Sequence, residues 1–157
     1  MFYGDDCSGL ADLVMRILSE RSPPNMFILA TSKPGRSHKA VVEFLDLVIL
    51  SGCGGSTPLS NRSHTAFVVG LTAECVKNLK SLVRSRGVEE IGSLKLCSGP
   101  YKEAEEVYSA IGDNSFSINF RERSKGFEQL KAKSNRRAKI SVEVFGELAF
   151  ICWEKWI

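Results

Sequence analysis

Residues 65–87, TAFVVGLTAECVKNLKSLVRSRG, contain the clearest strand-to-helix unit in the sequence. Residues 66–71 form a short apolar run with adjacent valines and a phenylalanine, which is typical of a buried strand. Thr72 stands where a helix N-cap belongs, and Gly87 stands where a left-handed residue often ends a helix. The stretch therefore predicts a strand followed by a helix of about 14 residues.

The helix expected after Thr72 has two distinct faces. Its apolar residues recur at spacings of three and four, as on a face that packs against a core: Cys75, Val76, Leu79, Leu82 and Val83. Three basic residues fall together on another face: Lys77, Lys80 and Arg84. Such a face is either a solvated helix surface or a binding surface for an acidic partner.

The overall composition is that of an ordinary globular domain. The chain has 157 residues, of which 43% are hydrophobic and 25% are charged, and a chain of this size can bury about two-thirds of its unfolded surface. No apolar run reaches the roughly 18 residues of a membrane span, and the first 20 residues lack the basic start of a signal peptide. We expect a single globular domain, residues 1–157, that is cytoplasmic and not secreted.

The five cysteines are odd in number and widely spread, and no two form a C-x-x-C pair: Cys7, Cys53, Cys75, Cys97 and Cys152. This usage predicts free, mostly buried thiols in a reducing compartment. Cys53 and His64 could serve as nucleophile and base only if folding brought them together. A small cysteine-dependent hydrolase is therefore kept as an alternative, and we expect no metal, cofactor, small-molecule substrate or catalytic residue.

Two short motifs resemble functional sites but lack the context that such sites need. Residues 3–6, YGDD, match the metal-binding turn of viral RNA-dependent polymerases, yet no strand precedes them, so we expect Asp5 and Asp6 to begin a helix. Residues 51–58, SGCGGSTP, are rich in glycine but lack the lysine of a phosphate-binding loop. We expect a flexible loop there.

The remaining apolar runs predict an α+β fold, a single compact domain with a mostly antiparallel sheet or sandwich and about three helices. Strands are expected at 26–31, 41–50, 92–97, 116–120, 140–144 and 148–153, and a helix at 101–111 that starts behind Pro100. Asp46 is the awkward residue of the 41–50 run. On a strand it would lie at an edge, pair with a base or mark an oligomer contact.

Residues 121–139 are the most charged part of the chain. They hold eight basic and two acidic residues, a local net charge of +6 against +3 for the whole protein. Only Phe127 and Leu130 interrupt the charges, so we expect a mobile or part-helical loop with a small apolar anchor. The segment is either a solvated loop or a binding site for phosphate backbone or anionic lipid. With the basic helix face, the residues expected to bind polyanions are Lys77, Lys80, Arg84, Lys131, Lys133, Arg136, Arg137 and Lys139.

A resemblance to a protein family also bears on what the basic residues bind. The succession FLDLVIL (44–50), a loop, FVVGL (67–71), Thr72 and AECVKNLKSL (73–82) resembles the strand, loop, strand and helix run of matrix proteins of negative-strand RNA viruses. It covers roughly 45 of the 157 residues. The resemblance implies a non-enzymatic structural protein that self-assembles and binds anionic membrane, nucleocapsid or both. It also implies a protein that is peripherally associated with a membrane or a virion. Residues 23–26, PPNM, depart from the PPxY motif that some of those proteins use in budding.

The charges also fit a nucleic-acid-binding regulator, such as a viral suppressor or movement factor, without any role for a membrane. Self-association is expected from the closing run 150–157, FICWEKWI. A terminal strand there would leave one backbone side unpaired, and Trp153 and Trp156 would be available to a second copy of the chain. We therefore expect a homo-oligomer that binds an anionic phospholipid surface, RNA or nucleocapsid.

Overall fold

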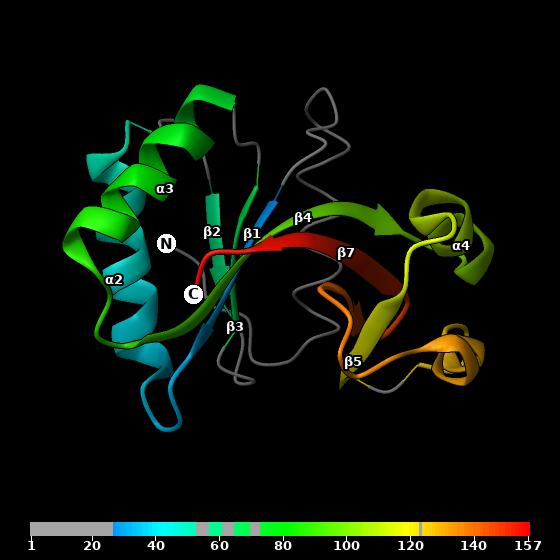
Figure 1. Cartoon of the computed structure of the whole chain (residues 1–157). Helices are drawn as coiled ribbons and strands as arrows, with labels where there is room; N and C mark the ends of the chain where they lie inside the picture. The colour runs from blue at the N-terminus through cyan, green and yellow to red at the C-terminus, as the bar shows by residue number, and fades with distance from the viewer. Residues whose placement is uncertain (1–26, 53–56, 61–64, 70–72, 123) are drawn as a thin grey trace.

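A seven-stranded sheet organises the fold (Figure 1). The computed structural model describes residues 27–157 apart from 53–56, 61–64, 70–72 and 123. Along the sheet the strands follow the order β2-β3-β1-β4-β7-β6-β5, and every neighbouring pair is antiparallel except β5 and β6. The strands are β1 Phe27–Ser32, β2 Thr57–Ser60, β3 Thr65–Val69, β4 Ile91–Tyr101, β5 Phe116–Glu122, β6 Ile140–Phe145 and β7 Leu148–Lys155. The expected α+β class with a mostly antiparallel sheet is confirmed.

Helices cover the two halves of the sheet separately. The helical elements are α2 Ser37–Leu50, α3 Ala73–Arg86, α4 Ala104–Ile111 and the 3-10 helix η1 Glu128–Lys133. Figure 1 shows α2 and α3 at one half of the sheet and α4 at the other. One buried cluster joins α2 and α3 to β1 and β4, and a second joins α4 and η1 to β6 and β7. In the described part of the chain, no helix is long and apolar enough to cross a bilayer.

The strand expected at 41–50 is wrong, because these residues belong to helix α2. The buried side chains of α2 recur at helical spacing, and they are Ala40, Val41, Phe44, Leu47 and Val48. Apolar residues spaced three and four apart line one face of a helix. This spacing outweighed the strand preference of the β-branched residues in the run. Asp46 is exposed on the helix, so it needs neither a strand edge nor a basic partner. The first strand of the matrix-protein resemblance is likewise a helix.

Most other expected elements are present, with two corrected boundaries. Pro100 lies within β4 instead of opening a helix. Helix α4 begins at Ala104 because the Glu106 carboxylate accepts hydrogen bonds from the backbone N–H groups of Lys102 and Glu103, which fixes its N-terminus. The end of the expected glycine-rich loop forms the short strand β2.

Several expectations fall outside the described residues. They are the YGDD turn and the helix expected after it, the glycines at 54 and 55, the Thr72 cap and the pair of Cys53 with His64.

The expectation of five free thiols is wrong. Cys97 on β4 and Cys152 on β7 form a disulfide. The two residues stand opposite each other in the antiparallel register of these strands, and both are buried. Sequence spacing missed the pair because 55 residues separate the two cysteines, and only the sheet brings them together. The disulfide also removes the thiol-based reason to expect a reducing compartment.

We predict that replacing both Cys97 and Cys152 by alanine lowers the free energy of unfolding by about 4 kcal/mol. Closing a loop of this length restricts the unfolded chain by roughly that amount. Urea unfolding of the variant and the wild type measures the difference. Thiol alkylation of the unreduced protein after unfolding in guanidinium chloride, read by peptide mass spectrometry, should leave both cysteines unlabelled, and full labelling of both would contradict the disulfide.

Candidate polyanion-binding surface

The segment between β5 and β6 is a crossover connection. The two strands are parallel, with Phe116 opposite Ile140 and Phe120 opposite Val144, so the chain between them must return across a face of the sheet. Helix η1 lies in this return, and the Phe127 and Leu130 side chains are buried in the cluster with α4, β6 and β7. The apolar anchor expected from the sequence is confirmed, and the segment is part-helical and held in place.

After η1 the crossover makes a hydrogen-bonded turn. The Asn135 backbone N–H donates to the Phe116 carbonyl oxygen at 2.6 Å, which ties the turn to β5. The Ala138 N–H donates to the Asn135 carbonyl at 3.1 Å, and the Arg137 N–H donates to the Asn135 side-chain oxygen at 3.0 Å. These bonds define a β-turn over 135–138 whose two central residues are Arg136 and Arg137. Both arginines are exposed.

Two lysines of the crossover lie over aromatic rings. Lys131 Nζ is 5.1 Å from the centre of the Phe120 ring, and Lys133 Nζ is 4.8 Å from the centre of the Tyr108 ring. An ammonium over a ring face is attracted by the ring quadrupole, which restricts the lysine without neutralising it. Both lysines stay exposed.

We call the last five cations of this segment the basic crossover: Lys131, Lys133, Arg136, Arg137 and Lys139. No acidic residue lies between Glu128 and Glu143 in the sequence. Among the residues that the structure describes, none of the five forms an ion pair. The result is an ordered surface of uncompensated positive charge.

The basic face of α3 is a separate surface. In Figure 1, α3 and the crossover lie at opposite ends of the sheet. Lys77 and Arg84 are exposed, but Lys80 forms an ion pair with Glu154 of β7. The hydrogen bond from Lys80 and its positive charge lower the pKa of the Glu154 carboxyl, against the opposing effect of desolvation. The structure therefore does not bring the two expected basic groups together, and Lys80 is already occupied.

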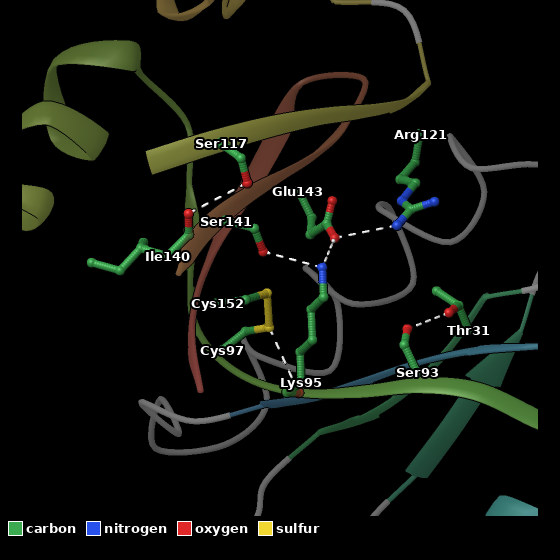
Figure 2. A network of polar contacts seen from close by, with 10 residues as sticks. All are labelled: Thr31, Ser93, Lys95, Cys97, Ser117, Arg121, Ile140, Ser141, Glu143 and Cys152. Carbon is green, nitrogen blue, oxygen red and sulfur yellow. Dashed lines mark hydrogen bonds and ion pairs between the residues drawn. A yellow bond between two sulfur atoms is a disulfide. The ribbon is translucent and has the colours of Figure 1, made fainter. Parts of the chain in front are cut away.

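A buried charge lies on the sheet near the crossover. Figure 2 shows Glu143 of β6 between Lys95 of β4 and Arg121 of β5. Glu143 is fully buried, and its Oε1 accepts hydrogen bonds from Lys95 Nζ at 3.0 Å and Arg121 Nη2 at 3.3 Å. Lys95 Nζ also donates to Ser141 Oγ at 3.3 Å. Glu143 Oε2 is buried without a hydrogen-bond partner.

This network holds cations in place but carries no evident chemistry of its own. A buried carboxylate is tolerated only when it is paired and hydrogen-bonded, and here the pairing ties three strands together. In the described ranges, no group of histidine, cysteine and acidic residues could hold a metal ion. Sequence alternation missed the network because Glu143, between Val142 and Val144, has the pattern of a strand with one solvated face.

The run with Trp153 and Trp156 lies at the end of β7, beyond the part of the strand that pairs with β6. Strand β7 lies between β4 and β6, and its residues 148–152 pair with β6, whereas Glu154 and Lys155 pair with β4 alone. Trp153 is 40% exposed, and its Nε1 donates to Ser98 Oγ. Trp156 packs against the α2–α3 cluster. Self-association through this run therefore stays a prediction.

Comparison with known proteins informs the fold alone. No family model and no curated protein matches the chain. Among solved structures, the chain is similar to the crystal structure of PH1313 from Pyrococcus horikoshii Ot3, with a TM-score of 0.52 and 15% sequence identity. The similarity covers 83% of this chain and 54% of PH1313, so this chain spans about half the length of that protein.

We predict that Glu143→Gln lowers the free energy of unfolding by about 2 kcal/mol, because Lys95 and Arg121 lose the charged partner that they share. Glu147→Gln, in the exposed turn between β6 and β7, is the matched control and should change stability little. Chemical unfolding measures both variants. Equal stability of Glu143→Gln and wild type would show that the pairing gives no net stabilisation.

Proposed function

We propose that this protein binds the phosphate backbone of single-stranded nucleic acid through the basic crossover. The turn over 135–138 carries the proposal, because it presents Arg136 and Arg137 side by side on a hydrogen-bonded backbone. A guanidinium matches the geometry of phosphate oxygens and can bind them with two parallel hydrogen bonds. A fixed pair of arginines loses less entropy on binding than a mobile loop would.

The surroundings of the turn favour nucleic acid over a lipid surface. Segments that lie on membranes usually insert an apolar face between the lipids. Here the apolar residues of the crossover, Phe127 and Leu130, are buried in the protein core. The crossover therefore offers charge without an apolar face to insert. Charge of this kind binds phosphate backbone with little sequence preference.

The test is binding of a fluorescent single-stranded RNA across a series of salt concentrations. We expect the variant Arg136→Gln/Arg137→Gln to bind at least about tenfold more weakly at low salt, since each charged hydrogen bond contributes about 1.5–3 kcal/mol. The slope of log affinity against log salt should become shallower by about 1.4, which is about 0.7 for each phosphate contact on a single strand.

Two controls distinguish binding at the basic crossover from attraction to any positive charge on the protein and from binding to lipid. Lys77→Gln/Arg84→Gln removes the same charge from α3, at the far end of the sheet, and should leave the affinity nearly unchanged. Vesicles of phosphatidylserine provide the lipid comparison. Equal losses in the two double variants, or a loss of vesicle binding with RNA binding intact, would refute binding of nucleic acid at the crossover.

Self-association is a second candidate property, supported by helix α2. Three of its apolar side chains are exposed, with Val42 at 44%, Ile49 at 73% and Leu50 at 60%. Val42 and Ile49 are seven residues apart and share one face of the helix. A second copy of the chain could cover this face in an isologous dimer.

We predict a concentration-dependent oligomer that Ile49→Ser shifts toward the monomer, because the substitution removes exposed apolar area from the α2 face. Trp156→Ala is the comparison and should mainly reduce stability, since Trp156 packs against the core. Sedimentation velocity at several protein concentrations measures the association. A wild type that stays monomeric at high concentration would exclude self-association.

A further inference from the structure

A pocket of about 150 Å³ lies beside the Glu143 network, where the basic crossover enters β6. Its volume is several times the ~30 Å³ that one water molecule occupies in the liquid, so a tetrahedral oxyanion fits inside. Polar residues from four strands and the crossover line it, among them Lys95, Ser117, Lys139, Ser141, Glu154 and Lys155.

A shift in strand register places two lysines at this pocket. Between β4 and β7, Lys95 is opposite Lys155 and Leu96 is opposite Glu154, whereas Cys97 is opposite Cys152. Trp153 is therefore an extra residue on β7, as in a β-bulge, and bulges re-aim the side chains that follow them. Lys95 and Lys155 face each other across the strands, and both line the pocket.

Like charges directly opposite each other on neighbouring strands destabilise a sheet. The protein supplies little negative charge here to offset the pair. Glu143 is shared between Lys95 and Arg121, and Glu154 is paired with Lys80. Within the described residues, Lys139 and Lys155 have no ion-pair partner. The pocket thus carries a surplus of positive charge that a bound anion would compensate.

We propose that this pocket binds a phosphate group, either inorganic phosphate or a phosphate monoester. Lys95, Lys139 and Lys155 supply the positive charge. Ser141 Oγ accepts a hydrogen bond from Lys95, so its own hydroxyl proton is free to be donated to a phosphate oxygen. Glu143 acts as a positioning residue that holds Lys95 toward the pocket. This site does not depend on nucleic-acid binding by Arg136 and Arg137.

Titration with inorganic phosphate tests the site directly, with binding measured by calorimetry and the melting temperature followed in parallel. Lys155→Met keeps the length of the side chain and removes one of the opposed charges. We expect it to weaken phosphate binding about tenfold or more, as the loss of one charged hydrogen bond would. Lys102→Met, an exposed lysine just beyond β4 and outside the pocket lining, should bind as the wild type does.

The melting temperature measured without phosphate separates the proposed site from a purely structural role of Lys155. If Lys95 and Lys155 repel each other, Lys155→Met should raise the melting temperature without phosphate and lose the further rise that phosphate causes in the wild type. Absence of saturable phosphate binding by the wild type would overturn the site. Equal losses in Lys155→Met and Lys102→Met, or a lower melting temperature of phosphate-free Lys155→Met, would also overturn it.

Two further measurements identify the source of the phosphate and separate this site from the basic crossover. A short RNA with a 5′-phosphate is compared with its 5′-hydroxyl form. Tighter, Lys155-dependent binding of the phosphorylated form supports an RNA end as ligand, and equal binding supports free phosphate. Arg136→Gln/Arg137→Gln should retain phosphate binding even where it loses RNA, and loss of both would show that the pocket is not a separate site.

Discussion

The parallel pairing of β5 with β6 is the constraint on which the proposed binding surface depends. Antiparallel neighbours can be joined by a tight turn, as β6 and β7 are at Gly146, but parallel strands need a connection that crosses the sheet. That connection contains Phe127 and Leu130, whose burial fixes it to the core. Its charged residues are then directed outward, and the turn at Asn135 fixes where the two arginines stand.

A second constraint is the buried carboxylate of Glu143. Burial of a charge is costly unless partners compensate it, and the two partners come from strands on either side of β6 in the sheet, β4 and β5. The pairing therefore fixes Lys95 and Arg121 on the sheet face where the β4–β7 disulfide also lies (Figure 2). Cations held by structural pairing need little reorganisation to meet an anion. The same interaction thus stabilises the sheet and prepares the pocket beside it.

Local patterns predicted those parts of the fold that depend on local sequence. Alternation along 116–120 and 140–144 indicated two amphipathic strands, and the spacing of apolar residues after Thr72 indicated α3. Helix α2 was not predicted, because the β-branched residues of the run were given more weight than its helical spacing. A contact distant in sequence also holds this helix, since Glu43 accepts hydrogen bonds from three backbone N–H groups at 89–91. The disulfide, the Glu143 network and the opposed lysines come from strand pairings that join distant residues, which no local pattern contains. The basic crossover was predicted as a charged segment, but its turn geometry required the structure.

Hydrogen exchange of the full chain, measured by mass spectrometry with and without single-stranded RNA, tests the central claim most directly. If the basic crossover binds the phosphate backbone, amides in 131–139 should exchange more slowly when RNA is present, and amides of α3 should not change. The Asn135 and Ala138 amides are already hydrogen-bonded in the free protein, so further protection there reports a bound strand over the turn. Slower exchange confined to α3, with residues 131–139 unaffected, would contradict the account.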